Sequence, residues 1–291
     1  MVAVTLAVGA AACSSLSVPR VDTSPFAGLG AWVSVFDYIP AFIPAAAPPP
    51  VVPATVDDLA KLGVHTLYLQ ATIDDPRAAG LIADAPLLAT MLRRAHADGL
   101  RVVAWYYPQL ADPSRDAARL DAMIGFRAGG EHFDGIGLDI ESAQVPTIAD
   151  RNQRLVALAQ HVRAKAATLP IGAIVYPAVL LEAVNPNLWP DFPYQALAPS
   201  VDVWLPETYW TLRSGPYRDA FTYTDQSIAR LRTDLHDPHA RVAPIGGEAG
   251  PSTPTDLNEF ALAVKKDGAI GRSIYDVTGT ATSDWPYLRQ P

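Results

Sequence analysis

The 291-residue sequence predicts an α/β protein built as a single (β/α)8 barrel. Short apolar segments alternate along the chain with longer amphipathic segments, and the apolar segments show little polar alternation. Strands of this kind are buried on both faces, which is typical of a parallel sheet covered by its crossover helices. Eight such units in about 250 residues match a closed barrel. An open doubly wound sheet is the alternative, but no glycine-rich phosphate loop follows the first strand.

The N-terminal part of the barrel is preceded by a segment rich in Ser, Pro and Gly, residues 14–29, which predicts a tether. The first strand is expected over residues 31–38. Residues 39–53 contain too many prolines for regular structure and predict a loop over the barrel mouth. The catalytic-type barrel domain is therefore expected to span residues 30–291.

The remaining units follow in order, and turn-forming residues separate them. Gly63 and Gly99 are placed to end helices, and several prolines make residues 177–200 irregular. The strands are expected over residues 64–71, 100–107, 133–141, 171–176, 201–207, 241–246 and 269–276. The helices are expected over residues 55–63, 85–99, 114–127, 148–167, 225–236 and 255–267.

The single cysteine, Cys13, follows an uncharged apolar run that is too short to cross a bilayer. The segment Ala-Ala-Ala-Cys-Ser-Ser resembles the lipobox of bacterial lipoproteins, although Ala10 stands where that family usually has Leu. The resemblance implies a signal segment over residues 1–13, export to the cell envelope, and a lipid anchor at Cys13 as the only membrane attachment. No Lys or Arg precedes Arg20, so a cleaved secretory signal or an apolar tail stay open as alternatives.

Charge and motif content exclude several other functions. The net charge of −8 and the absence of a basic stripe argue against a nucleic-acid partner. The sequence has no His-Glu-x-x-His pattern, no Gly-x-Ser-x-Gly elbow, no phosphate loop and no Cys/His metal spacing. We therefore expect neither a metal nor a cofactor, and the sequence does not determine the oligomeric state.

Acidic and aromatic residues gather at the predicted strand ends, where a barrel builds its active site. Acids provide hydrogen-bond acceptors for sugar hydroxyls, and flat rings stack on sugar C–H faces, so this composition indicates a carbohydrate ligand. Some of these acids are expected instead to cap helices or pair with Arg. The predicted catalytic residues are Asp139, Glu141, Glu207 and Glu248, and the predicted substrate-binding residues are Asp37, Tyr38, Trp105, Tyr107, Tyr176, Tyr209, Trp210 and Asp276.

The segment Phe-Asp-Gly-Ile-Gly-Leu-Asp-Ile-Glu-Ser, residues 133–142, resembles the strand-four signature of family 18 glycosidases, the chitinase-like enzymes. Asp134, Asp139 and Glu141 fall at the spacing of that signature, whose terminal Glu is the acid. Gly137 stands where the family usually has a further Asp, and Ile140 where it often has an aromatic residue. Over about ten residues, the resemblance implies a superfamily relation more strongly than a particular activity.

Two more segments match the chitinase-like enzymes loosely. Leu-Pro-Glu-Thr-Tyr, residues 205–209, stands where such enzymes carry a strand-six Tyr and acid. At the end of the eighth strand, Tyr275 and Asp276 replace the Trp of that family.

Alternation along a strand places Asp139 and Glu141 on one face, pointing into the barrel mouth. Two close carboxylates resist double ionisation, so one can hold a proton near neutral pH. Resemblance to family 18 implies that Glu141 is the acid, that Asp139 orients a substrate acetamido group that attacks, and that Tyr209 binds that group. Alternatively, Glu207 or Glu248 is a nucleophile about 5 Å from Glu141, as in retaining glycosidases.

The second mechanism resembles clan A glycosidases, which place acids at the ends of strands four and seven. Glu248 follows the predicted seventh strand, but Ile140 stands where that clan typically has Asn. The sequence thus predicts a glycoside hydrolase-like protein acting on a polysaccharide or cell-envelope glycan. The alternative is a non-catalytic carbohydrate-binding or envelope scaffold protein on the same barrel.

Overall fold

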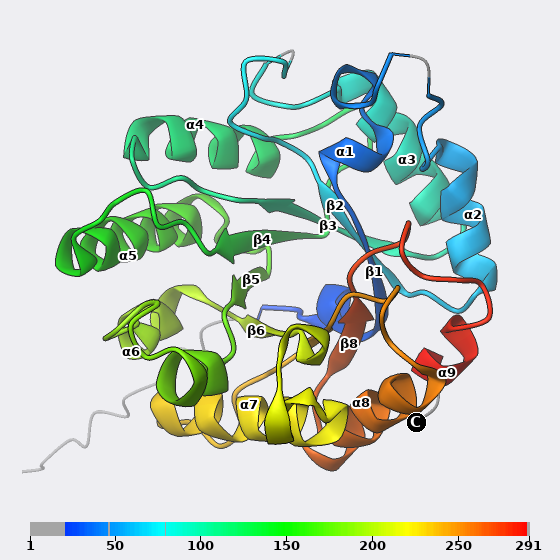
Figure 1. Ribbon diagram of the computed structural model, residues 1–291. Coiled ribbons are helices and arrows are strands. Elements are labelled where there is room, and N and C mark those ends of the chain that lie inside the picture. Colours follow the sequence, from blue (N-terminus) through cyan, green and yellow to red (C-terminus); the bar gives the residue numbers. More distant parts are fainter. Residues whose placement is uncertain (1–20, 46, 79, 290–291) are drawn as a thin grey trace, which may run out of the picture.

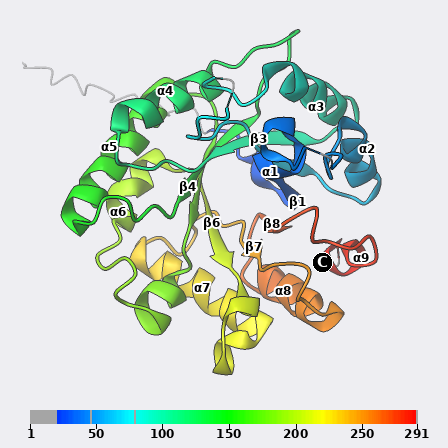
Figure 2. The same cartoon turned by 45° about the horizontal axis from the view of Figure 1, so that its top comes forward.

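A computed structural model describes residues 21–45, 47–78 and 80–289 and shows a closed barrel of parallel strands surrounded by helices (Figures 1 and 2). Each strand pairs with the next in the sequence, and the last strand pairs with the first. The predicted single (β/α)8 barrel is confirmed. The strands are β1 (Gly28–Val33), β2 (Thr66–Gln70), β3 (Arg101–Tyr106), β4 (Gly135–Ile140), β5 (Ile171–Val175), β6 (Val203–Thr208), β7 (Ile245–Gly246) and β8 (Gly271–Ile274).

The helices of the outer ring lie close to the expected segments. Their bounds are α2 (Pro53–Lys61), α3 (Ala85–Ala97), α4 (Pro113–Ile124), α5 (Ile148–Lys165), α7 (Ala220–Asp234) and α8 (Pro254–Lys266), with short helices α1 (Val35–Tyr38), α6 (Tyr194–Leu197) and α9 (Trp285–Arg289). Side chains of Asp84, Asp112, Asp219 and Thr253 accept backbone N–H bonds at the starts of α3, α4, α7 and α8. These caps satisfy donors that have no partner inside the helix.

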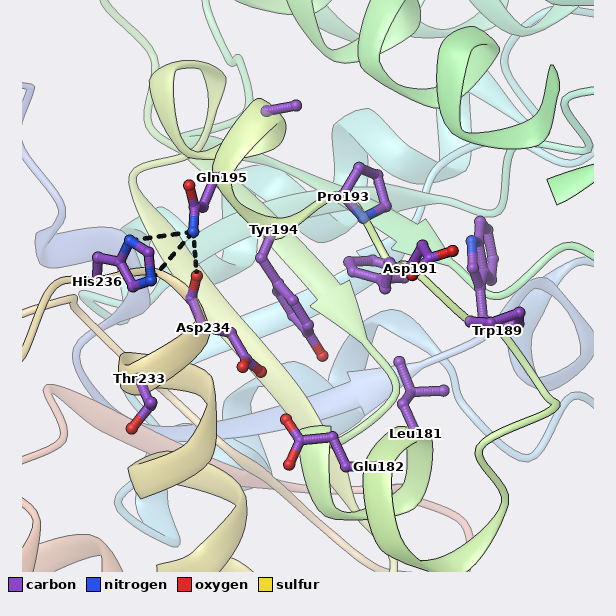
Figure 3. Close-up of a pocket in the computed structure, with 13 residues that line it drawn as sticks. Leu181, Glu182, Trp189, Asp191, Pro193, Tyr194, Gln195, Thr233, Asp234 and His236 are labelled. Atoms are coloured by element: carbon purple, nitrogen blue, oxygen red, sulfur yellow. Dashed lines mark hydrogen bonds between the residues drawn. The ribbon is translucent and has the colours of Figure 1, made fainter. Parts of the chain in front are cut away.

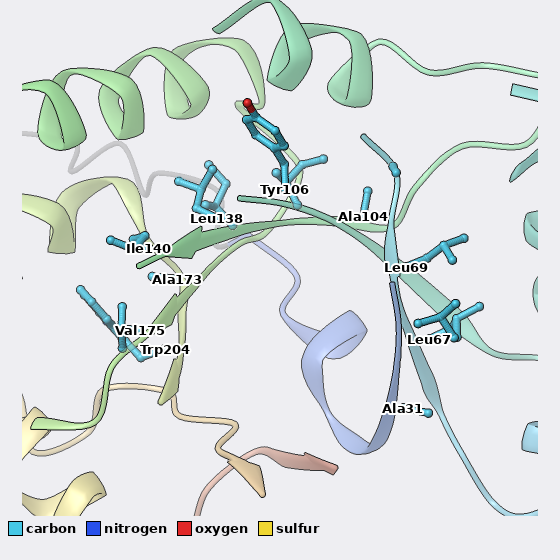
Figure 4. Packing of buried hydrophobic residues seen from close by; sticks show 14 of the residues in the cluster. Ala31, Leu67, Leu69, Ala104, Tyr106, Leu138, Ile140, Ala173, Val175 and Trp204 are labelled. Atoms are coloured by element: carbon cyan, nitrogen blue, oxygen red, sulfur yellow. The ribbon is translucent and has the colours of Figure 1, made fainter. Parts of the chain in front are cut away.

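Alternation along the strands divides the apolar side chains between two regions. Leu67, Leu69 and Leu138 point outward and pack beneath the helices (Figure 4). Val103 and Leu205 belong to the separate cluster that fills the barrel. Because both faces of every strand are buried, the strands lack the polar alternation of a half-exposed sheet.

The first strand starts at Gly28, earlier than the expected residue 31, and this corrects the expected start of the strand and the expected end of the tether. A 3-10 helix, η1 (Ser24–Phe26), precedes β1, and Phe26 is only 1% exposed. A Cβ added at Gly172 would lie 2.5 Å from the Phe26 ring, so the glycine provides the space that this ring fills inside the barrel. The described part of the expected tether, residues 21–29, is therefore part of the domain, because Phe26 closes one end of the barrel core.

Asp37 and Tyr38 were expected at the end of the first strand, but they lie in α1. The chain leaves β1 at Val33, and Ser34 then caps a short helix with Asp37 at its third position. The Pro-rich residues after α1 form a loop with a 3-10 helix, η2 (Pro40–Phe42). The predicted loop therefore contains one turn of helix.

Within residues 21–45, 47–78 and 80–289, no helix is both long enough and apolar enough to span a membrane. Cys13 and the signal segment, residues 1–13, lie outside the described residues. Lipidation at Cys13 stays a prediction of the sequence.

Candidate active site

The barrel mouth brings three carboxyl groups together from two strands. Asp139 lies near the end of β4, Glu141 follows that strand, and Glu207 lies near the end of β6. One carboxylate oxygen from each residue lies within 4.8 Å of the others. All three line a cavity of about 190 Å³, together with Trp32, Trp105, Ile174, Tyr209, Ile245 and Tyr275.

The three acids differ in burial, and this determines how they hold protons. Asp139 and Glu207 are 9% and 8% exposed, whereas Glu141 is half-buried at the open side. Burial, followed by the charge of Glu141, raises the pKa of Asp139 well above its ordinary value. Burial, followed by the charge of Glu141 and a hydrogen bond to it, raises the pKa of Glu207 in the same direction. At neutral pH, Asp139 and Glu207 therefore bind protons more readily than isolated carboxyl groups do.

One hydrogen bond and one unpartnered oxygen affect the chemistry of the cluster. The Tyr209 hydroxyl donates a hydrogen bond to Glu207 Oε1 at 3.0 Å, which favours the charged form of Glu207. Asp139 Oδ1 is buried and has no hydrogen-bond partner among the described residues. A protonated Asp139 beneath Glu141 thus costs less than a second buried charge would.

Aromatic rings form the wall of the cavity. Trp32 stacks on Tyr68 with ring centroids 4.2 Å apart and donates its indole N–H to Ser273 Oγ at 2.8 Å. Trp105 meets the Trp32 ring edge-on at 5.7 Å. The Trp105 indole nitrogen is buried without a hydrogen-bond partner in the described part of the chain. A ligand in the cavity would therefore meet flat apolar faces, as C–H faces of a sugar require.

Sequence reasoning did not assign Trp32, Ile174 or Ile245 to the site, and it placed Tyr275 at a strand end without counting it among the substrate-binding residues. Trp32 was missed because the expected first strand, residues 31–38, put the strand end too late. A predicted strand that ended at Val33 would have placed Trp32 at the mouth, because Trp32 points inward between the outward residues Ala31 and Val33.

Two of the predicted binding residues lie at the rim beside Glu141. The Tyr176 hydroxyl lies 3.4 Å from the Glu141 carbonyl oxygen, to which it donates. Burial, followed by the Glu141 charge, raises the pKa of Tyr176 above that of an ordinary phenol. Burial also raises the pKa of Tyr107, and the charges of Glu141 and Asp139 add to this. Both phenols therefore stay protonated and can donate hydrogen bonds near the mouth.

Asp37 and Tyr38 have structural partners and do not line the cavity. Asp37 Oδ2 accepts from the Ser34 backbone N–H at 2.6 Å and from the Ser34 hydroxyl at 2.8 Å. The Tyr38 hydroxyl donates to the Gln70 carbonyl at 2.6 Å, and Tyr38 is 1% exposed. Asp37 therefore caps the start of α1, and Tyr38 joins α1 to β2, while their part in substrate binding stays a prediction of the sequence.

Trp210, Glu248 and Asp276 also lie outside the cavity lining. Trp210 is completely buried and packs on Phe260, with ring centroids 5.3 Å apart. Asp276 accepts from the Thr278 hydroxyl and the Gly279 N–H, at 2.6 and 2.8 Å, in the loop after β8. Glu248 is exposed after β7 and is not part of the acidic cluster. Of the two acids considered as partners of Glu141, the fold therefore brings Glu207 to it.

At Gly137, neighbouring side chains leave little space for the Asp that the family 18 signature usually has there. A Cβ added there would lie 3.1 Å from Trp105 Cβ and 3.2 Å from Ile174 Cδ1, so the barrel has little room for an Asp. Asp134 precedes β4 and accepts from the Val102 N–H at 2.8 Å and contacts His96 at 3.0 Å. Asp134 therefore joins the segment before β4 to β3 and α3, while Asp139 and Glu141 occupy the mouth.

The same three acids form the group that could hold a metal ion within the described residues. Carboxylate oxygens are the ligands that Mg²⁺ and Ca²⁺ prefer, but they must be deprotonated to bind. Burial raises the pKa values of Asp139 and Glu207, so protons compete strongly with a cation there. The donor set therefore fits proton transfer better than metal binding.

Fold and site together define a (β/α)8 barrel with an acidic, aromatic-walled mouth. Comparison with solved structures finds the same fold in other proteins. An endo-1,4-beta-mannanase from Rhizomucor miehei aligns with a TM-score of 0.67 at 7% identity, covering 91% of this chain and 90% of that chain. A GH18 chitinase from Pseudoalteromonas aurantia aligns with a TM-score of 0.62 at 13% identity, covering 89% and 97%.

A third structure has the same fold, the PgaB (BpsB) glycoside hydrolase domain from Bordetella bronchiseptica. It aligns with a TM-score of 0.63 at 12% identity and covers 90% of this chain and 98% of that chain. No protein-family model and no curated protein matches the sequence. At these identities the similarity shows the fold, and the chemistry has to be argued from the site.

Proposed function

We propose that this protein is a glycoside hydrolase that acts on a polysaccharide or cell-envelope glycan by carboxylate acid/base catalysis. The observation that carries the proposal is the cluster of Asp139, Glu141 and Glu207, whose oxygens lie within 4.8 Å of one another at the barrel mouth. Retaining glycosidases use two carboxyl groups about 5 Å apart, one as acid/base and one as nucleophile. Mannan- and chitin-degrading enzymes with the same fold support a glycan substrate.

Glu141 is the proton donor in this proposal, because it is the member of the cluster that reaches the open side of the mouth. Glu141 and Glu207 together carry one charge in the reactive form. The reaction needs the charge on Glu207 and the proton on Glu141. The Tyr209 hydroxyl, which donates to Glu207 Oε1, favours the charge on Glu207, whereas burial and the Glu141 charge oppose it. Glu141 then protonates the leaving oxygen while Glu207 attacks the anomeric carbon and forms a covalent glycosyl ester. Glu141 next accepts a proton from the water that attacks this carbon, and the bond to Glu207 breaks.

Asp139 serves this pair by remaining neutral. Its burial raises its pKa, so it adds no second negative charge beneath Glu141. An ionised Asp139 would hinder the ionisation of Glu207 in the same cavity.

Attack by a substrate acetamido group has less support than attack by Glu207. In that route Tyr209 would bind the acetamido group, but its hydroxyl already donates to Glu207. In addition, Trp105 and Ile174 fill the space that the further acid of the family 18 signature would need at Gly137. Both features favour the two-carboxylate mechanism.

Turnover of a panel of β-linked and α-linked glycans by the wild type and by Glu141→Gln, Glu207→Gln and Glu248→Gln tests the proposal. Removing an acid/base or nucleophilic group is expected to lower kcat/KM by roughly 10²–10⁴-fold. Glu248→Gln is the matched control and should stay within about twofold of the wild type, since this side chain is exposed outside the cluster.

Both routes retain the anomeric configuration, so two other measurements distinguish them: azide should restore turnover to Glu207→Ala by replacing the nucleophile, and glycans without an acetamido group should be turned over by the wild type. Equal activity of wild type and Glu141→Gln would remove Glu141 from the mechanism. Binding of a glycan with no turnover in any variant would instead support the carbohydrate-binding alternative.

A further inference from the structure

A second pocket lies on the flank of the barrel (Figure 3), and it shares no lining residue with the mouth cavity. Its volume is about 560 Å³, compared with about 190 Å³ for the mouth cavity. It is lined by the π-helical turn η3 (Leu180–Val184), by residues 189–196 around α6, and by the C-terminal end of α7. We call it the flank pocket, and none of the residues assigned to the proposed catalytic site lines it.

Two acids of the flank pocket share a proton. Burial, followed by a hydrogen bond to Glu182, raises the pKa of Asp234 to about 7. Asp234 Oδ2 is buried and receives no hydrogen bond from any donor in the described segments. Two carboxyl groups that face each other with one proton between them lose that proton readily when a cation approaches.

The other polar groups of the flank pocket do not neutralise this pair. Arg230 forms an ion pair with Glu182 and also lowers the pKa of Asp234, but no ion pair joins it to the Asp234 side chain within the described residues. His236 contacts the Gln195 amide nitrogen at 3.1 Å instead of a carboxylate. Once the shared proton leaves, the two carboxylates thus face one guanidinium, and a negative charge remains.

A buried hydroxyl provides the second, independent indication of a ligand. Tyr194 is 8% exposed, and its hydroxyl has no hydrogen-bond partner within residues 21–45, 47–78 and 80–289. It points into the pocket on the side of Asp234 and Glu182 (Figure 3). Phe192 lies against Tyr194 with ring centroids 4.6 Å apart and adds an apolar wall. An unpartnered buried hydroxyl costs free energy that a ligand can recover.

We propose that the flank pocket binds a small protonated amine, with its ammonium group between Asp234, Glu182 and the Tyr194 hydroxyl and its C–H-rich body on Phe192. An ammonium group offers three donors and no acceptor, which matches two carboxylates and one hydroxyl oxygen. Binding releases the shared carboxyl proton to solvent and leaves an ammonium–carboxylate pair. This site is independent of the catalytic proposal, because it uses none of the same residues.

Calorimetric titration of the full chain with n-butylamine, and with n-butanol as the uncharged match, tests the site. The amine is expected to bind and the alcohol is not. Because one proton with a pKa of about 7 must leave, the amine should bind roughly tenfold more weakly at pH 6 than at pH 8. Repeating the titration in buffers of different ionisation enthalpy should change the measured heat of binding, because the buffer takes up the released proton.

Glucosamine and N-acetylglucosamine form a second pair of probes, and tighter binding of glucosamine than of butylamine would identify an amino sugar as the source of the amine.

Asp234→Asn and Tyr194→Phe are expected to weaken amine binding at least tenfold and about fivefold, respectively, through a lost charge and a lost hydroxyl. Asp58→Asn is the matched control, since Asp58 is exposed on α2 and pairs with Lys61. Thermal unfolding verifies that each variant is folded, and glycan turnover by these variants should match the wild type. Butanol binding as tightly as butylamine, or unchanged amine affinity in both flank variants, would overturn the proposal.

Discussion

Restoring the missing acid of the chitinase-like signature tests how far packing determines this site. In Gly137→Asp, the new Cβ would lie 3.1 Å from Trp105 Cβ and 3.2 Å from Ile174 Cδ1, both closer than ordinary van der Waals contact. Overpacking of this kind costs about 1–3 kcal/mol, and Gly137→Ala isolates it. The carboxyl group adds a buried polar group without a prepared partner, which costs about 1–3 kcal/mol more. We therefore expect Gly137→Asp to lose roughly 2–6 kcal/mol of unfolding free energy.

Urea unfolding of the wild type, Gly137→Ala and Gly137→Asp, followed by tryptophan fluorescence, measures this difference. The added carboxyl group lies two residues before Asp139 on the same strand face, so its pKa in the folded state is expected to be raised by burial. A raised pKa makes the folded state lose stability as the pH increases above the unfolded-state pKa. The deficit relative to Gly137→Ala should therefore grow between pH 5 and pH 8, by roughly 1.4 kcal/mol for each pH unit that separates the folded and unfolded pKa values.

A Gly137→Asp variant as stable as the wild type at pH 8 would refute the packing explanation. That result would mean that the barrel has room for the acid and that its absence has no packing cause. A gain of chitin turnover in Gly137→Asp would contradict the preference for the two-carboxylate mechanism.

Two further predictions concern the mouth and the closed end of the barrel. Tyr209→Phe removes the hydrogen bond that favours ionised Glu207, so the acidic limb of the kcat/KM profile should move to higher pH and kcat should fall about 10-fold; an unchanged profile would show that this hydroxyl does not assist Glu207. Phe26→Ala empties the space beside Gly172 and should cost roughly 3–5 kcal/mol in chemical denaturation; a loss below about 1 kcal/mol would mean that residues up to 26 act as a tether.

The sequence by itself determined the barrel and the identity of two central acids. Apolar strands without polar alternation require cover on both faces, and this local signal is repeated along the whole chain. Strand periodicity also placed Asp139 and Glu141 on one inward face, because alternation depends only on neighbouring residues. The same local pattern could not set the end of the first strand, so Asp37 and Tyr38 were assigned to the mouth in place of Trp32.

Only the tertiary structure decided which distant residues meet. Glu207 lies near the end of β6 and Glu248 follows β7, yet Glu207 points into the mouth and Glu248 faces solvent. This choice depends on where each strand ends relative to the barrel and on which way its last residues turn, and neither is encoded in local periodicity. The closure of the sheet likewise determined that Phe26 fills one end and that Trp105 and Ile174 occupy the space beside Gly137, because packing inside a barrel is shared by side chains from several strands.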